Sequence, residues 1–212
     1  IGAHEGVLRT QKMVYLAGDK TKEAVYTENG IQLKLNVETV YFSARSSTER
    51  KRIYQMVKPG EIILVMFSGC APYPCVISKN TKANKIIGIE LNPEGHKYGL
   101  ENVKLNKLKN VELYEGDVRK VVPTLENKTF DRIIMPLPHT ADDFLDLAFS
   151  VAKKGTIIHM YDFMEEELPK ASMDKIKKAC EELKRDCEIL ELVKCGQFSP
   201  RTFRICVDFV MD

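Results

Sequence analysis

The sequence lacks the patterns that mark several common classes of protein. No apolar run approaches the roughly 18 residues that a membrane-spanning helix needs, and no secretory apolar region is present. The six cysteines form no Cys-x-x-Cys pair, and no Cys/His cluster has the spacing of a zinc site. We therefore expect a protein of the reducing cytoplasm with neither a membrane span nor a bound metal.

Two phosphate-binding motifs are also missing. The loop Ser68-Gly69-Cys70-Ala71-Pro72 contains no Gly-x-Gly-x-x-Gly pattern, and no Gly-Lys-Ser/Thr follows it. A ligand with a diphosphate group is therefore disfavoured. No excess of one charge sign stands out either, because 32 Lys and Arg against 30 Asp and Glu leave a net charge of +2. Total charge thus neither requires nor excludes a nucleic-acid partner.

The 212 residues, of which 44% are hydrophobic, suffice for one α/β domain plus a small accessory piece. Short strands broken by turns are expected between Met13 and Phe42, starting with Met13–Gly18, and a helix is expected over residues 43–57. Strands and helices alternate from Gly60 on, which predicts a mostly parallel sheet. The expected strands are 62–67, 86–90, 111–114, 130–135, 156–161, 188–194 and 201–210, and the expected helices are 93–108, 141–152 and 172–184.

These elements divide the chain into a small β-rich segment with a connecting helix at residues 1–57 and one α/β domain at 58–212. The first residue is Ile rather than Met, and residues 1–9 show little apolar periodicity. We therefore expect a natural N-terminal part to be missing.

The stretch from Ile62 to Glu90 has the pattern of a unit that holds a nucleoside. An apolar run, a turn of small residues and a second apolar run closing on an acid form such a β-loop-α-β unit. Glu90 is placed to accept hydrogen bonds from ribose hydroxyls, and Asp117, after the next strand, is placed to accept from an adenine amine. The expected ligand is thus a nucleoside without phosphates, and S-adenosylmethionine fits this description.

Several runs resemble the archaeal and eukaryotic-type tRNA (guanine-37, N1) methyltransferases, a Rossmann-like family that uses S-adenosylmethionine. The resemblance extends from about Val7 to the end of the chain and does not include the additional N-terminal domain of the family. The runs are VYFSARSSTERKRI, MFSGCAPYP, IIGIELNPEGHKYGLENVKLNKLKNVELYEGDVR, FDRIIMPLPHTADDFLDLA, GTIIHMYDF and FSPRTFRICVDF.

The resemblance implies a cofactor site, a general base and two catalytic cations. Glu49 would take the proton that guanine N1 loses, and Arg9 and Arg45 would stabilise negative charge at O6. Without the resemblance, we would interpret Glu49 as an acid in the first turn of a helix and Arg45 as a cap or surface residue. The residues that would line the cofactor site are Tyr41, Phe67, Gly69, Glu90, Leu91, Asp117 and Val118.

Two departures from the family pattern bear on substrate and cofactor. The family often has Asn at the position of Pro136, and proline cannot supply the hydrogen bonds of that side chain. Proline there resembles an archaeal branch in which some members also methylate carbon 7 of a wyosine precursor at the same nucleotide. Relatives commonly have Asp at Val65, so one polar contact to the cofactor is absent or comes from elsewhere.

Two alternatives stay open. A related aminocarboxypropyltransferase of wybutosine synthesis uses the same cofactor, although Arg45, which that branch tends to lose, favours methyl transfer. The other alternative is a noncatalytic RNA-binding module. We expect a monomer whose partner is the anticodon loop of tRNA.

Candidate RNA-facing residues are basic. Of the four scattered histidines only His139 sits where a flipped base would pass. The basic candidates are Arg45, Arg50, Lys51, Arg52, Arg119, Lys120, Arg201 and Arg204.

Overall fold

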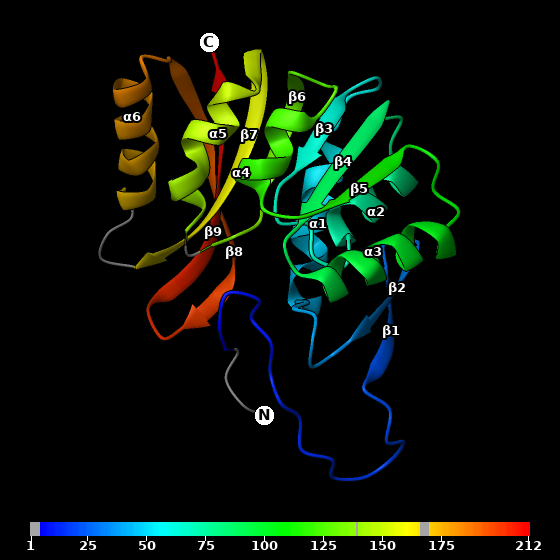
Figure 1. Cartoon of the computed structure of the whole chain (residues 1–212). Coiled ribbons are helices and arrows are strands. Elements are labelled where there is room, and N and C mark those ends of the chain that lie inside the picture. The colour runs from blue at the N-terminus through cyan, green and yellow to red at the C-terminus, as the bar shows by residue number, and fades with distance from the viewer. Residues whose placement is uncertain (1–4, 139, 166–169) are drawn as a thin grey trace.

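The computed structural model describes residues 5–138, 140–165 and 170–212 and is built on a central β-sheet (Figure 1). Within these ranges the sheet has seven strands in the order β5-β4-β3-β6-β7-β9-β8, and β9 runs antiparallel to both of its neighbours. The strands are β3 (Ile62–Val65), β4 (Lys85–Glu90), β5 (Val111–Glu115), β6 (Phe130–Met135), β7 (Ala152–Glu165), β8 (Cys187–Ser199) and β9 (Thr202–Met211).

The strand order reverses between β3 and β6, which pair in parallel. The chain moves outward from β3 through β4 to β5, returns to β6, and then moves outward the other way. In open α/β sheets, ligands bind at such a reversal, beyond the carboxyl ends of the strands. The fold therefore marks the ends of β3 and β6 as the place to look for a site.

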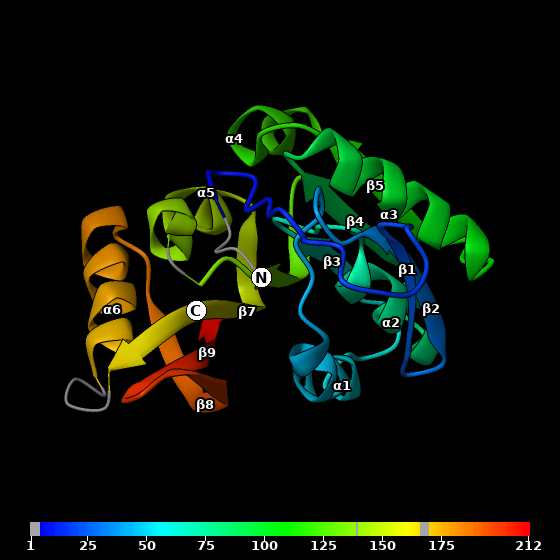
Figure 2. The ribbon, with the colours of Figure 1, turned by 90° about the horizontal axis from the view of Figure 1, so that it is seen from below.

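Helices cover both faces of the sheet, because its central strands are apolar on both sides. Leu64 and Ile133 pack with α4, α5 and α6, whereas Ile63, Val65 and Ile134 pack with α1 and α2. Figure 2 shows α4 and α5 on one side of the strands and α1 and α2 on the other. The helices are α1 (Ser47–Gln55), α2 (Pro72–Asn80), α3 (Pro93–Leu105), α4 (Val118–Val121), α5 (Leu145–Ser150) and α6 (Ala171–Leu183), with 3-10 turns η1 (Ala44–Ser46), η2 (Val122–Thr124) and η3 (Ala141–Phe144).

A separate hairpin of β1 (Glu23–Glu28) and β2 (Ile31–Asn36) lies beside α3 (Figure 1). The side-chain amide of Asn102 on α3 accepts from the amide of Lys34 at 2.7 Å and donates to its carbonyl at 3.0 Å. Asn106, one turn later, makes the same pair of bonds to Gln32, at 2.9 and 2.7 Å. Asn102 also donates to the carbonyl of Cys70, so α3 joins the hairpin to the loop after β3.

The structure corrects two of the expected elements. Met13–Gly18 forms no strand, and its apolar residues Val14 and Leu16 are 79% and 89% exposed, so the apolar letters there bury nothing. The helix expected over 141–152 is a 3-10 turn followed by the short α5, and Ala152 already belongs to β7.

The division of the chain at residue 57 stays a prediction. Ile31 and Leu33 of β2 and Ile53 of α1, which precede that point, pack in the same apolar cluster as Ile63 and Val65 of β3. Among the residues that the structure describes, no helix combines the length and the apolar character that crossing a membrane requires.

Candidate functional site

A pocket opens where the strand order predicts it, beside the segments that follow β3 and β6. It encloses about 600 Å³ of empty space, part of it open to solvent. Most of its lining is aromatic or proline rings, with a few polar groups among them. The lining residues are Tyr41, Phe42, Ser43, Ser46, Arg50, Phe67, Ser68, Gly69, Pro72, Tyr73, Pro136, Pro138, Tyr161 and Arg204.

The loop after β3 adopts a strained path that brings its backbone to the pocket wall. Phe67, Gly69 and Ala71 all have positive φ, at 61°, 57° and 64°, a backbone conformation that residues other than glycine rarely adopt. Such strain clusters at ligand sites, where the surrounding structure enforces it. At neighbouring Gly88 on β4, an added Cβ would come within 2.6 Å of the Leu113 side chain and 3.1 Å of Ser68, so a larger residue would have to displace these side chains.

Glu90, at the end of β4, holds this loop in place. One carboxylate oxygen accepts from the amide of Gly69 at 2.6 Å and the other accepts from the amide of Asn92 at 2.7 Å. Burial raises the pKa of Glu90, while the hydrogen bonds from these two amides act in the opposite direction. A carboxylate oxygen has two lone pairs, so each oxygen keeps one for a hydroxyl group.

The other predicted cofactor residues lie along the same edge in different environments. Leu91 is 46% exposed, and the carboxylate of Asp117 accepts from the Arg119 amide and so caps α4. The side chain of Val118 packs into the apolar core, so only its backbone can contact a ligand. Tyr41 lines the pocket.

Glu49, the predicted base, is buried behind the pocket wall and does not line the pocket. Its oxygen Oε1 accepts from the Tyr161 hydroxyl at 2.7 Å, and Tyr161 does line the pocket. The Tyr73 hydroxyl in turn donates to Tyr161 at 2.8 Å. Arg52 donates to both Glu49 oxygens, at 2.8 and 2.7 Å. One hydroxyl group therefore separates Glu49 from the pocket.

A chain of buried polar groups continues from Arg52 through the core. Arg52 also pairs with Asp208 of β9 at 2.5 Å, and Nδ1 of His159 on β7 lies 2.6 Å from the same carboxylate. Nη1 of Arg132 on β6 lies 2.7 Å from Nε2 of His159, and Arg132 pairs with Glu61 at 2.8 Å. Because a guanidinium only donates, Nε2 must accept, and the proton of neutral His159 sits on Nδ1 and points to Asp208.

Three of these core groups have the composition of a metal site. Ligand atoms of His159, Cys206 and Asp208 lie within 4.8 Å of one another. However, the two nitrogens of His159 are already bonded to Asp208 and Arg132, and the Cys206 thiol donates to Asp208 at 3.1 Å. Burial raises the pKa of the Cys206 thiol far above its ordinary value, which opposes metal binding by the thiolate. The group is a hydrogen-bonded core cluster.

The structure places the remaining predicted site residues at different distances from the pocket. Pro136 is part of its lining, and the guanidinium of Arg9 stacks 4.0 Å from the centre of the Tyr41 ring. Arg45 is exposed and does not line the pocket. His139 lies outside the described residues.

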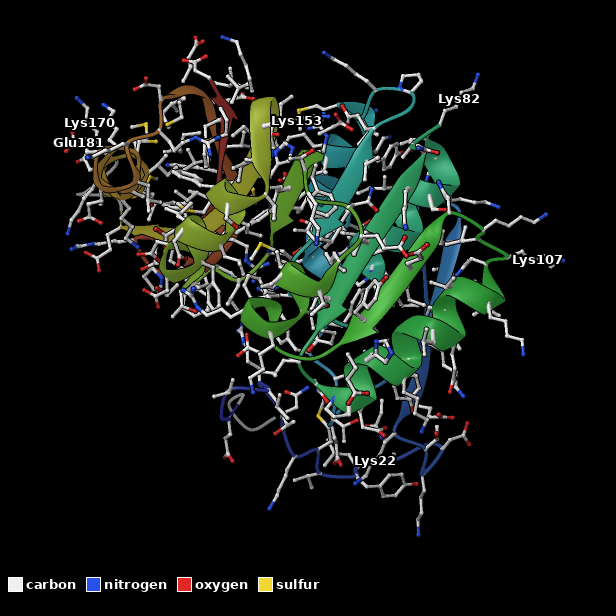
Figure 3. The ribbon with its side chains drawn as sticks, turned by 45° about the horizontal axis from the view of Figure 1, so that its top comes forward. Lys22, Lys82, Lys107, Lys153, Lys170 and Glu181 are labelled. Atoms are coloured by element: carbon white, nitrogen blue, oxygen red, sulfur yellow. The ribbon has the colours of Figure 1, made fainter. Side chains whose placement is uncertain are left out.

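Some of the predicted basic residues are paired with acids and others are exposed. Arg50 is buried and pairs with Glu28 at 2.5 Å, Arg52 is engaged as above, and Arg119 pairs with Asp146 at 2.9 Å. Arg45, Lys51, Lys120 and Arg201 are exposed. Figure 3 shows further labelled lysines, Lys82, Lys107 and Lys170, pointing outward at the margin of the molecule, whereas Lys22 and Lys153 pair with Glu38 and Asp131.

Sequence reasoning missed Tyr73 and Tyr161, which line the pocket, and it named Arg204 only as one of the basic residues of an RNA-facing surface. One signal was present for Tyr161, because it ends the expected strand 156–161, and the ends of parallel strands converge at the site. Arg204 and Tyr161 also share a face of the sheet, since β7 and β9 pair with Tyr161 opposite Cys206 and side chains alternate along a strand.

Comparison with known proteins assigns this fold and pocket to a family. The sequence pattern of the TRM5/TYW2 methyltransferase domain matches residues 24–190. The chain belongs to this family. Its fold is accordingly a Rossmann-like methyltransferase fold.

Relatives in the family carry more than one activity in their names. A tRNA (guanine(37)-N(1))-methyltransferase, Trm5b of Pyrococcus abyssi, is 38% identical over 206 residues, which are 97% of this chain and 60% of that protein. A tRNA (guanine(37)-N(1))/4-demethylwyosine(37)-methyltransferase, Taw22 of Nanoarchaeum equitans, is 33% identical, covering 98% of this chain and 85% of its own. The chain thus spans about 60% of the length of its Trm5b relative.

Solved structures agree with this fold. The crystal structure of Pyrococcus abyssi Trm5b matches with a TM-score of 0.88 and 36% identity over 98% of this chain and 61% of that one. The crystal structure of Methanocaldococcus jannaschii TYW2 in complex with AdoMet matches with a TM-score of 0.84 and 29% identity, over 95% and 90%.

Proposed function

We propose that the protein is an enzyme that transfers the methyl group of S-adenosyl-L-methionine to N1 of guanosine 37 in tRNA. The observation that carries this proposal is the pocket beside the ends of β3 and β6, with Tyr161 on its wall and Glu49 hydrogen-bonded to the Tyr161 hydroxyl from behind. A nucleobase that loses a proton as it gains a methyl group needs a proton acceptor within reach. Kinship with Trm5b supports the proposal.

The residues around the loop after β3 fit the cofactor. Glu90 keeps acceptor lone pairs for ribose hydroxyls, Asp117 keeps acceptor capacity for an amine, and the motifs that cradle a diphosphate are absent from the chain. When bound, S-adenosylmethionine supplies an electrophilic methyl group. The residues that would hold it are Tyr41, Phe67, Gly69, Glu90, Leu91, Asp117 and Val118.

Glu49 acts as the base through Tyr161. The N1 proton moves to the Tyr161 oxygen while the Tyr161 hydroxyl proton moves to Oε1 of Glu49, along the 2.7 Å hydrogen bond that already joins them. Burial raises the pKa of Tyr161 far above its ordinary value, so a free tyrosinate is costly and the two transfers occur together.

Arg9 and Arg45 contribute positive charge around the base. Arg9 already contacts the Tyr41 ring at the pocket wall. Arg45 lies on the surface beside the pocket residue Ser46, so its proposed contact with the nucleotide requires that RNA be bound. Pro136 restricts the shape of the pocket through its ring.

A second acceptor, carbon 7 of a wyosine precursor, is favoured by Pro136. The pocket wall there carries a proline ring instead of the amide that the family often uses to hold guanine, so it selects less strictly for that base. Aminocarboxypropyl transfer is the alternative reaction at the same atom, and a noncatalytic RNA-binding module is the alternative without a reaction. The proposal also includes the anticodon loop as partner, a cytoplasmic location and a monomeric state.

Mass spectrometry of nucleosides tests the proposal. An unmodified tRNA transcript with guanosine at position 37 is incubated with S-adenosylmethionine and the wild-type protein, Glu49→Gln or Glu61→Gln. We expect 1-methylguanosine with the wild type and a loss of about 100-fold or more in turnover with Glu49→Gln. Glu61→Gln removes a carboxylate of similar burial that pairs with Arg132 outside the pocket lining, and it should keep turnover in the folded fraction.

The other outcomes separate the alternatives. A methyl gain only on the wyosine precursor assigns the carbon-7 reaction, and an aminocarboxypropyl gain assigns the transferase. RNA binding without any dependence on cofactor, together with no mass gain on either substrate, assigns the noncatalytic module.

A further inference from the structure

Arg204 is a charged group of the pocket that the proposed function leaves unused. It comes from β9, opposite Phe163 of β7, and lines the pocket. Nη1 donates to the Ser46 hydroxyl at 2.8 Å, and Nη2 lies 3.4 Å from the Tyr41 hydroxyl. Its Nε is buried and has no hydrogen-bond partner among the residues that the structure describes. Two neutral hydroxyls therefore orient the guanidinium and leave it donors to spare.

The other buried or half-buried arginines on this side of the sheet are neutralised by acids. Arg50 pairs with Glu28, Arg52 with Glu49 and Asp208, and Arg132 with Glu61. Within the described part of the chain, no carboxylate lies within 4.0 Å of the Arg204 guanidinium. A half-buried cation with an unbonded N–H is unfavourable by itself, so a ligand that accepts from it would relieve that cost.

Position in the sheet indicates what this ligand is. Arg204 and Tyr161 lie on the same face of adjacent strands, on the wall of one pocket. Guanine presents the N1 proton and the O6 acceptor on neighbouring atoms, so a group that accepts from N1 and a group that donates to O6 must also be neighbours. The surrounding aromatic and proline rings fit a flat base better than a phosphate.

We propose that Arg204 donates to O6 of the target guanine and stabilises the charge that collects there as N1 loses its proton. This inference rests on the proposed function and assigns a further catalytic residue to it. When the N1–H bond breaks, its electron pair delocalises onto O6, and the new N1–methyl bond returns the ring to neutrality. Because O6 is most negative midway, the contact is stronger in the transition state than with bound guanine.

A binding cycle tests the contact without relying on turnover. Two tRNA transcripts, with guanosine or with 2-aminopurine at position 37, are titrated with wild type and Arg204→Gln in the presence of S-adenosylhomocysteine. 2-Aminopurine lacks O6. We expect the wild type to bind the guanosine transcript about 10- to 100-fold more tightly, and Arg204→Gln to lose most of this difference. 2-Aminopurine also lacks the N1 proton, but this change affects wild type and Arg204→Gln alike. The difference between the two proteins therefore reports on O6.

Three controls accompany the cycle. Arg201→Gln removes the same charge from the exposed turn beside β9 and should weaken both transcripts equally. Arg204→Lys keeps the charge and should recover part of the preference. Thermal unfolding and the affinity for S-adenosylhomocysteine should be unchanged in Arg204→Gln, which shows that the variant is folded with its cofactor site intact.

Turnover on the guanosine transcript completes the test, and we expect kcat to fall about 100-fold in Arg204→Gln. The inference is overturned if the transcript preference survives in Arg204→Gln, if wild type shows no preference, or if the variant loses affinity for S-adenosylhomocysteine, which would place Arg204 at the cofactor carboxylate. Absence of 1-methylguanosine with the wild type contradicts the proposed function instead, and the binding cycle still reports on Arg204.

Discussion

The two faces of the central sheet are stabilised in different ways. On the face covered by α4, α5 and α6, most buried side chains between sheet and helices belong to an apolar cluster that includes Leu64, Ile133 and Phe149, and the buried carboxylate of Asp162 pairs there with Lys175. On the face covered by α1 and α2, apolar side chains share the interior with a chain of buried ionisable groups from Glu61 to Glu49.

This difference coincides with the position of the pocket. Tyr161 and Arg204 lie on the face that holds the charges, whereas on the apolar face packing is the main interaction to satisfy. Buried ion pairs contribute little net stability compared with apolar groups of the same shape, because desolvation offsets their attraction. We therefore attribute Arg52 and Asp208, the members of this chain next to Glu49, to positioning of Glu49 rather than to stability.

The largest effect should come from breaking the charged face at Arg132. Arg132→Met leaves Glu61 buried without its partner and His159 without a donor, and we expect a loss of about 3 to 5 kcal/mol in the free energy of unfolding, measured with urea. Adding Glu61→Gln should restore part of the loss, because it removes the unpaired charge. A single variant as stable as wild type would contradict the ion-pair account.

The charged face should also make stability depend on pH. Burial lowers the pKa of His159 below its ordinary value of 6.5, so the unfolded chain binds its proton more readily than the folded protein does. Stability from this group is complete at high pH and declines as the pH falls below about 6.5. Between about pH 7.5 and about pH 5.5, wild type should lose more free energy of unfolding than His159→Gln; equal losses would show that His159 is not buried in its neutral form.

A change on the apolar face should act through packing alone. Ile158→Val deletes one buried methylene group between the sheet and its helices, and we expect a loss of about 0.5 to 1.5 kcal/mol with no change in its pH dependence. Urea unfolding at two pH values measures both quantities. A pH-dependent loss would mean that the two faces are coupled.

The smallest effect should come from an ion pair outside both faces. Lys178 and Glu182 on α6 approach to 3.7 Å with side chains 75% and 65% exposed. Solvent screens such a pair, so Lys178→Ala should change the free energy of unfolding by less than about 0.5 kcal/mol. A loss as large as that of Arg132→Met would contradict the distinction between buried and exposed pairs.

Local pattern sufficed for the fold, because each element of the unit from β3 to β4 is specified by residues close in sequence. The pattern also predicted Glu90 at the end of a strand. In the structure the Glu90 carboxylate accepts hydrogen bonds from the amides of Gly69 and Asn92, so it lies against the loop after β3. The pattern gave a wrong prediction for Met13–Gly18, because most of the apolar residues there stay exposed instead of packing against the rest of the fold.

The site was less predictable, because its groups meet only after folding. Glu49 contacts Tyr161 across 112 positions, and Arg52 contacts Asp208 across 156. No local spacing distinguishes Arg50 and Arg52, which are bound to acids, from Arg204, which is not. The roles of Glu49 and of the cofactor residues therefore stay predictions that the proposed variants test.

Asn102 and Asn106 of α3 take the place of a neighbouring strand beside β2, the hairpin strand that faces α3. Their amide groups, one helical turn apart, meet alternate residues of β2 as a further strand would, with a donor and an acceptor to each. An uncovered strand edge invites pairing with another chain, which leads to aggregation or domain swapping. By occupying this edge of β2, the two asparagines should keep it from recruiting a second molecule.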